Sequence, residues 1–399
     1  MAKFDFNSSR YARLFSPKQT DKRLLTTIVN DEDIIGVNNS WYFTQGSVDT
    51  SYTPVDTEGY ATFTVRERKL KAAPMAALRA PLGDTTQLDN GGVSFYSATI
   101  PDFITPKFVE TAMSREDKEK RFAMFGNDTE IMKQWIANST DLKSSMDSTM
   151  NWMTAQLMTT GKIIYGKVGD VRIDGIFSPL HKADIPAANF RKAGSVVWTD
   201  PAAKIITEMQ NIEGDYRSLW SFDGAMKWQM TKKFFLNVFI KNKEVLDKVN
   251  EFRNLNDLVS VTFNNINTDV FNGAWENVRS AFGLSPIEIV EEKEFFKNAA
   301  TGETTPVHGW ADNIIVLRPA GDAVKFMRKQ ILDETYAKYL NESVIRNFAP
   351  INNGLGTLVN TTVPNGMYKE WQTVIMFSAV PALVEFTKHV IIDTATANS

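Results

Sequence analysis

The chain has no cysteine and only three histidines among its 399 residues. Without cysteine there is no disulfide, no thiolate metal site and no cysteine nucleophile. This composition fits a protein that assembles in a reducing cytoplasm. The histidines, His181, His308 and His389, are far apart and show no metal-ligand spacing. Distance in sequence does not exclude a zinc site or a Ser-His-Asp triad, but no other pattern in the chain supports either one.

The sequence also lacks an excess of one charge and a long apolar run. It has 44 basic and 47 acidic residues, a net charge of −3. A nucleic-acid binder needs a strong basic excess, so this class is disfavoured. The most apolar late stretch, 374–386, is too short to span a bilayer. The first residues contain Asp5 and no apolar run, unlike a signal peptide. We expect a soluble protein with no membrane partner.

Motifs for phosphate binding and acyl transfer are missing. The stretch from Thr159 to Lys162 resembles the end of a phosphate-binding loop, but that loop requires a glycine where Gln156 stands and a hydroxyl residue where Ile163 stands. No Gly-x-Ser-x-Gly elbow occurs. The acidic cluster at 291–294 lies beside lysines and is typical of a solvated face. The sequence therefore predicts no catalytic residue, no cofactor and no metal, and the chain is expected not to be an enzyme.

The strongest positive signal is one long helix that leads into a β-hairpin. Met146, Met150, Met153 and Leu157 follow each other at steps of four, three and four, which places them on one helix face. The helix is expected from about 128 to 160, with Gly161 in the left-handed position after the last turn. Residues 163–165 and 171–174 are strand-like, with turn glycines between them. The methionine face is expected to pack on a small sheet made of this hairpin and strands near 371–392.

Five regions follow along the chain. Residues 1–47 are predicted to be an N-terminal arm, ordered by a partner or packed on its own domain. Residues 48–108 form an extended loop with two strand-like limbs around Phe63 and Phe95. An isolated two-stranded ribbon is marginally stable, so it needs its own core or a neighbouring subunit. Residues 109–197 hold the long helix and hairpin, 198–366 an α/β block, and 367–399 strands that return to the first domain.

Within the α/β block, Asp200 and Pro201 are expected to start a helix. Thr231 is expected to cap a helix that continues to Val249, and a further helix is expected from Thr268 to Gly283. Strands are predicted at 227–230, 286–290 and 314–317. Residues 323–348 are expected to be largely helical and 350–366 to be a loop. Strands follow at 371–377 and 383–392, divided by Pro381.

A basic group lies in the extended loop. Its members are the candidates for contact with another subunit: Arg66, Arg68, Lys69, Lys71 and Arg79. Arg66 and Arg68 would share one side of a strand. They either pair with an acidic surface on an adjacent copy or form a solvated edge that resists aggregation. A nucleic-acid site would need interleaved aromatic residues, which this group lacks.

The order of these parts resembles the major capsid protein of tailed bacteriophages, with the phage-lambda-like major capsid family as the nearest likeness. Four motifs carry the resemblance, in pieces over roughly 109–399: Leu-Met-Thr-Thr-Gly-Lys-Ile at 157–163 with Val-Arg-Ile-Asp at 171–174, Trp-Thr-Asp-Pro at 198–201, the strand at 310–317, and Phe-Ser-Ala-Val-Pro at 377–381. The arm and extended loop match in position and character but not in residues.

The resemblance implies an α+β fold of the Hong Kong ninety-seven type, with an N-terminal arm, an extended loop, a spine-helix peripheral domain and an inserted α/β axial domain. It implies a virion shell protein, assembled in the host cytoplasm, that forms an icosahedral capsid around double-stranded DNA without sequence-specific contacts. The implied partners are further copies in hexamers and pentamers, a portal protein, and scaffolding, decoration or head-stabilising proteins as further candidates.

Two alternatives remain open at this point. An encapsulin-like bacterial nanocompartment shell would share the fold and differ in cargo. An enzyme built on the 198–366 block is the alternative from another class, although no nucleophile motif or cofactor loop supports it. Some capsids of this fold crosslink a loop lysine to an asparagine of a neighbour, but no motif places that asparagine or its assisting glutamate here. No long N-terminal scaffolding segment is visible, so any scaffolding protein is expected to be separate.

Overall fold

The structure is a computed structural model that describes residues 41–56, 61–68, 92–100, 107–110, 128–163, 181–220, 224–252, 268–290, 295–297, 304–306, 308–329, 347–351, 355–365 and 368–398. The chain divides into two compact units, each made of several segments. Unit 1 comprises 1–63, 99–151 and 326–381, and unit 2 comprises 64–98, 152–325 and 382–399. None of the described helices is both long and apolar enough to cross a bilayer. The predicted N-terminal arm lies almost wholly outside the described residues.

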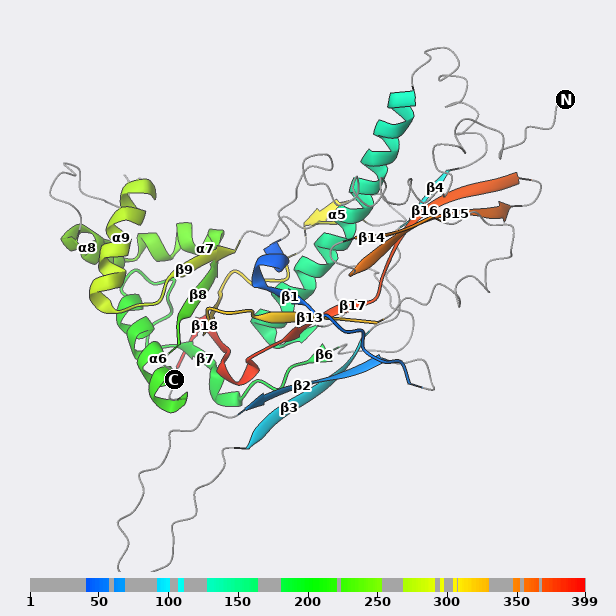
Figure 1. The fold of residues 1–399 in the computed structure, drawn as a ribbon. Coiled ribbons are helices and arrows are strands. Elements are labelled where there is room, and N and C mark those ends of the chain that lie inside the picture. The colour runs from blue at the N-terminus through cyan, green and yellow to red at the C-terminus, as the bar shows by residue number, and fades with distance from the viewer. Residues whose placement is uncertain are drawn as a thin grey trace, which may run out of the picture. The chain divides into compact units, whose positions relative to one another are not determined.

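Helix α5 (Asp128–Thr160) is the long predicted helix (Figure 1), with residues up to 151 assigned to unit 1 and those from 152 to unit 2. Its 33 residues span roughly 50 Å at about 1.5 Å per residue. Met146, Met150, Met153 and Leu157 are all fully buried, so the predicted face is confirmed. Gly161 has a φ of 68° and its N–H donates to the carbonyl of Leu157 at 2.8 Å, which confirms the predicted helix end.

Unit 1 contains a four-stranded antiparallel sheet in the order β14 (Asn347–Ile351), β15 (Gly356–Asn365), β16 (Tyr368–Phe377) and β4 (Lys107–Glu110). The predicted loop at 350–366 is therefore wrong, because β15 pairs with β16 along its whole length. The Thr and Val residues at 357–363 favour a strand, and only the ends of this region have turn composition. Residues 323–348 were predicted to be largely helical, but β13 (Val324–Arg328) is a strand and 330–346 lie outside the described residues.

Unit 2 contains a five-stranded mixed sheet in the order β7 (Phe190–Ala193), β18 (Val390–Ala397), β12 (Ile314–Pro319), β8 (Met226–Thr231) and β9 (Ile287–Val290). The outer pairs are parallel and the inner pairs antiparallel. Its helices are α6 (Ile205–Trp220), α7 (Lys232–Asn237), α8 (Lys243–Phe252) and α9 (Thr268–Phe282), which gather beside the sheet in Figure 1. The predicted strands at 227–230, 286–290 and 314–317 are confirmed.

Two predicted helices of unit 2 need correction. The helix expected to start at Asp200 and Pro201 begins at Ile205, because Asp200 accepts the N–H of Ala202 at 2.8 Å within a turn that precedes the helix. Thr231 caps α7 as predicted, but the chain does not continue as one helix to position 249. It passes through a short 3-10 turn, η4 (Phe239–Lys241), and starts again at α8, where the Asn242 side chain accepts the N–H of Val245 at 3.2 Å.

The remaining strands form small sheets. Strands β2 (Ala61–Arg68) and β3 (Val93–Ile100) make a two-stranded ribbon, as the two limbs of the extended loop predicted. A three-stranded sheet has the order β1 (Gly46–Val48), β13 and β17 (Ala379–Leu383), and β10 (Phe295–Lys297) pairs with β11 (Thr304–Pro306). A 3-10 turn, η2 (Trp41–Gln45), precedes β1.

Strand pairing around the predicted hairpin differs from expectation. Strand β5 (Lys162–Ile163) pairs with β6 (His181–Lys182), and the predicted second hairpin strand at 171–174 lies outside the described residues. The returning strands pair elsewhere within the described part: β16 with β15 and β4, and β18 with β7 and β12. Pro381 lies inside β17 rather than between strands. The domain boundaries at 47, 108, 197 and 366 stay predictions.

Candidate inter-subunit surface

The two buried histidines are structural. His181 on β6 and His389 before β18 are each 2% exposed. The His389 Nε2 donates to the carbonyl of Met158, in the last turn of α5, at 2.6 Å. Burial lowers the pKa of each imidazole to about 4, so both are neutral at pH 7. Among the described residues, no group of three or more His, Asp or Glu side chains could hold a metal ion.

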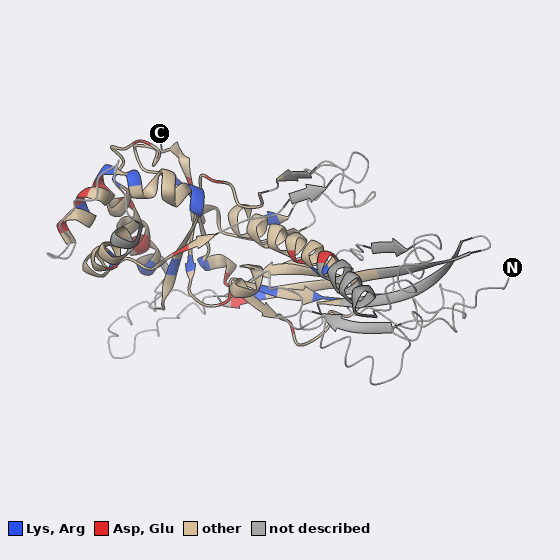
Figure 2. Cartoon of the chain, turned by 90° about the horizontal axis from the view of Figure 1, so that it is seen from above, with Lys and Arg blue, Asp and Glu red and all other residues tan. Residues whose placement is uncertain are grey.

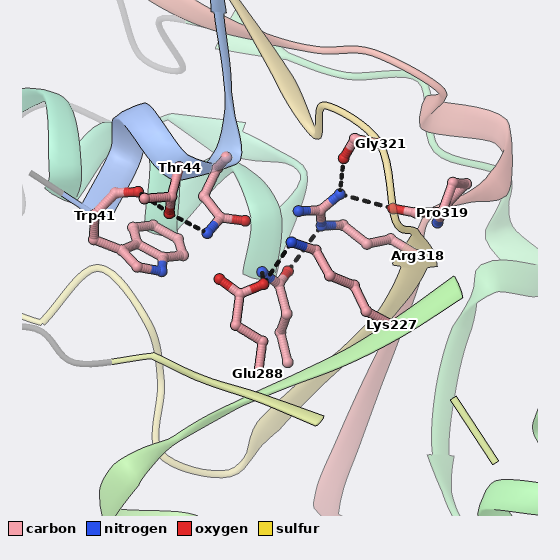
Figure 3. A network of polar contacts seen from close by, with 9 residues as sticks. Trp41, Thr44, Lys227, Glu288, Arg318, Pro319 and Gly321 are labelled. Carbon is pink, nitrogen blue, oxygen red and sulfur yellow. Dashed lines mark hydrogen bonds and ion pairs between the residues drawn. The ribbon is translucent and has the colours of Figure 1, made fainter. Parts of the chain in front are cut away.

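A polar network in unit 2 joins three neighbouring strands (Figure 3). Lys227 on β8 pairs with Glu288 on β9 at 2.5 Å, and Gln229 donates to the same carboxylate at 3.1 Å. The Arg318 Nε on β12 donates to the side-chain Oε1 of Gln229 at 2.9 Å, and its guanidinium also donates to the backbone carbonyls of Pro319 and Gly321. Burial lowers the pKa of Arg318 to about 10, which leaves it charged. The arrangement stabilises the sheet internally and offers no reacting group.

Two glutamates of α6 accept indole N–H groups. Glu213 is buried and accepts from Trp228 at 2.5 Å and from the backbone and hydroxyl of Ser285 at 2.8 and 3.1 Å. Glu208 accepts from Trp198 at 2.6 Å and from the N–H of Gly194 at 2.9 Å. These carboxylates fix α6 to the segments that flank the sheet.

Charges on the surface of unit 2 are mixed. Basic and acidic residues are interspersed along its helices (Figure 2), and several form ion pairs such as Lys248 with Glu251 and Arg279 with Glu276. The helices of unit 2 thus carry charges of both signs, whereas a surface that binds a nucleic-acid backbone is predominantly basic.

The β2–β3 ribbon is the element with two contrasting faces. Hydroxyl pairs cross it between Thr62 and Thr99 at 3.3 Å and between Thr64 and Ser97 at 2.9 Å. Continuing the same antiparallel register places Arg66 opposite Phe95. We call this side of the ribbon the outer ribbon face. Its described members are Thr62, Thr64, Arg66, Val93, Phe95, Ser97 and Thr99.

The outer ribbon face exposes apolar side chains. Val93 is 58% exposed and Phe95 64% exposed, the highest values among the large hydrophobic residues of the described part. The opposite side of the ribbon is buried, with Ala61, Phe63, Tyr96, Ala98 and Ile100 each under a tenth exposed. An apolar strip flanked by hydroxyl groups and an exposed Arg66 has the composition of a contact surface.

The structure locates only part of the predicted contact group. Arg66 is exposed on the outer ribbon face, and Arg68 is the last residue of β2. Lys69, Lys71 and Arg79 lie outside the described residues. The sequence analysis did not single out Val93 and Phe95, the two exposed apolar residues of this face. The alternation of β3 was visible, but it did not reveal which of its two faces is buried.

Comparison with known proteins shows likeness in structure only. No protein-family model and no curated protein matches the chain. Among solved structures, the putative capsid protein of a prophage of E. coli CFT073 is 13% identical, with a TM-score of 0.51 over 93% of this chain and 98% of that chain.

Two further neighbours are more distant. A phage-related protein from Bordetella bronchiseptica RB50 is 12% identical, with a TM-score of 0.43 over 94% of this chain and 96% of that chain. A virus-like particle from Pyrococcus furiosus is 8% identical, with a TM-score of 0.36 over 88% of this chain and 91% of that chain.

We base the fold assignment on the prophage protein, which has the highest TM-score of the three. The chain has the mixed α and β fold of tailed-phage capsid proteins, and the fold class predicted from the sequence is confirmed. Assignment to the lambda-like subfamily stays a prediction.

Proposed function

We propose that this chain is a major capsid protein, the repeating subunit of an icosahedral shell that encloses double-stranded viral DNA. The observation that carries the proposal is the likeness to the prophage capsid protein, which extends over nearly the whole of both chains. The near-neutral net charge of −3 agrees with a shell that does not immobilise its DNA. The proposed role is structural, in line with the capsid protein that the chain is similar to.

Contacts between copies are the second part of the proposal. The outer ribbon face is a contact surface for another copy of the chain, with Phe95 and Val93 as its apolar centre and Arg66 at its edge. Exposed apolar strips of this kind become stable when a partner covers them. Arg68, Lys69, Lys71 and Arg79 continue the basic group and are proposed to meet acidic residues of that neighbour.

The proposed regions of the chain and their partners follow from the proposed capsid function. The regions 1–47, 48–108, 109–197, 198–366 and 367–399 are proposed as arm, extended loop, peripheral domain, axial domain and returning strands. Copies would form hexamers and pentamers in the host cytoplasm. A portal protein and scaffolding, decoration or head-stabilising proteins would complete the particle, whose DNA is held without sequence-specific contacts.

A substitution on the outer ribbon face tests the contact proposal. Phe95→Glu places a charge where an apolar neighbour is expected, so it should prevent closed shells while leaving the subunit folded. Ile289→Glu on the edge strand β9 is the control, because Ile289 is also partly exposed, at 38%, but lies off the ribbon. Negative-stain electron microscopy and circular dichroism provide the measurements. Normal shells from Phe95→Glu would contradict the proposed contact.

The nature of the cargo separates phage from nanocompartment. Particles isolated from the natural source should contain double-stranded DNA that is protected from nuclease. Particles that contain only a cargo enzyme would instead establish the encapsulin-like alternative.

A further inference from the structure

The segment 383–389, which connects β17 to β18, is unusually buried for a polar turn. It contains the 3-10 turn η6 (Phe386–Lys388), and Thr387, Lys388 and His389 are all under a tenth exposed. Lysine is rarely buried to this degree unless it is paired. The segment lies within unit 2, together with β6, α6, the end of α5 and most of the β2–β3 ribbon.

One set of contacts fixes the segment to the body of unit 2. The Asn189 amide donates to the carbonyls of Thr387 and His389 at 2.8 and 3.0 Å, and the Tyr216 hydroxyl donates to the carbonyl of Lys388. The His389 ring donates to the end of α5, as described above. The acceptors of most of these bonds are backbone carbonyls of the segment, so the bonds fix the path of its backbone.

A second set of contacts fixes the ribbon to the segment. The Glu67 carboxylate on β2 accepts the N–H of Thr387 at 2.8 Å and lies 3.5 Å from the Lys388 Nζ. Both side chains of this ion pair are only 9% exposed. On β3, the Tyr96 hydroxyl donates to the carbonyl of Leu383 at 2.8 Å, and its ring meets Phe386 edge to face at 4.9 Å.

The two sets of contacts differ in the free energy that is needed to break them. If the ribbon leaves, Glu67 returns to water, and Lys388 keeps a second carboxylate, Glu385, at 2.7 Å. Separation of the Glu67–Lys388 pair therefore leaves no uncompensated buried charge, because Glu67 is rehydrated and Lys388 keeps Glu385. The contacts to Asn189, Tyr216 and the end of α5 stay in place. Release of the ribbon is thus a local opening that is separate from unfolding of the sheet.

We propose that the 383–389 segment is a latch that fixes the base of the β2–β3 ribbon and can release it while the rest of unit 2 stays folded. Glu67 and Tyr96 are the two residues of the ribbon that engage it. This inference rests on the proposed function in one respect: release allows the outer ribbon face to be redirected as copies come together. The latch itself is a property of the single chain.

Hydrogen exchange on unassembled subunits tests the latch. Glu67→Gln keeps an oxygen for the Thr387 N–H but removes the charge that faces Lys388, and Tyr96→Phe removes only the hydroxyl. In both variants the amides of β2, β3 and Thr387 should exchange at least about tenfold faster, the factor expected from losing one strong hydrogen bond. The amides of the central strand β12 should keep their rate.

The control variant is Glu251→Gln, which removes an exposed ion pair with Lys248 elsewhere in unit 2 and should leave ribbon exchange unchanged. Unchanged ribbon exchange in both latch variants would overturn the proposal. Acceleration of β12 together with the ribbon would also overturn it, since the ribbon would then open only by global unfolding. Failure of the wild-type chain to form shells would count against the proposed function and leave the exchange result intact.

Discussion

Acidification is expected to destabilise unit 2 through its two buried histidines. His181 and His389 have a pKa of about 4 in the folded chain, because burial disfavours the charged imidazolium. In the unfolded chain both titrate near a pKa of about 6.5. Between these two values the unfolded state binds more protons than the folded state. The stabilisation is therefore complete above pH 6.5 and is lost as the pH falls toward 4.

The size of the effect follows from the difference in pKa. Each histidine should lower the free energy of unfolding by about 2 kcal/mol at pH 5 and by about 3 kcal/mol below pH 4, relative to pH 7.5. The contributions of the two residues should add if their protonations are independent. A loss of about 4 kcal/mol at pH 5 is a large part of the total stability of a typical domain.

Urea unfolding of unassembled subunits at pH 7.5 and pH 5, followed by tryptophan fluorescence, measures this loss. His389→Gln keeps a side-chain N–H for the Met158 carbonyl and removes the titrating group, so its loss between the two pH values should be about 2 kcal/mol smaller than that of the wild type. His308→Gln is the control, because His308 is exposed. If His389→Gln loses as much stability as the wild type, burial of a neutral imidazole is not the cause.

Two further pairs of substitutions, each a test variant with its control, probe a close packing contact and a buried carboxylate in unit 2. Gly309→Ala should destabilise the fold by about 1–3 kcal/mol, because the new Cβ would lie 2.6 Å from the Trp152 carbonyl oxygen. The control is Gly214→Ala in α6, whose new Cβ meets nothing within 4 Å, so it should be neutral or stabilising by up to about 1 kcal/mol. Thermal melting would show both, and equal melting temperatures would contradict the close packing. Glu213→Gln should cost about 1–3 kcal/mol, since it weakens three hydrogen bonds to a buried carboxylate, whereas Glu276→Gln on the surface should cost under about 1 kcal/mol. Similar urea midpoints for these two variants would refute the role of the buried carboxylate.

The long helix was predictable because its signals are local. The methionine stripe repeats at helical spacing, and Gly161 provides the left-handed residue that ends the last turn. The central strands were predictable for a similar reason, since runs such as 314–317 are short, apolar and β-branched. These elements follow from neighbouring residues alone.

The strand β15 was missed because its ends have loop composition. Glycine, asparagine and proline stand near both ends, while Thr and Val residues fill the middle. The structure shows that pairing with β16 over ten residues decides the outcome. Such long-range pairing is set by tertiary contacts, which override local propensity.

The faces of the ribbon could not be assigned from sequence for a related reason. Both alternating sets of β3 contain aromatic residues, Phe95 on one side and Tyr96 on the other. Tyr96 is the buried one because its hydroxyl donates to the Leu383 carbonyl, 287 residues further along the chain. A contact at that distance in sequence leaves no local signal, so the alternation of β3 alone does not tell which of its faces is buried.

The central claim is that the chain forms a closed shell from many copies of itself. Electron microscopy of the purified wild-type protein, with image reconstruction of the particles, tests it most directly. We expect icosahedral shells in which this chain occupies hexamers and pentamers, with the outer ribbon face covered by a neighbouring copy. A protein that stays monomeric or dimeric under all assembly conditions would contradict the assignment.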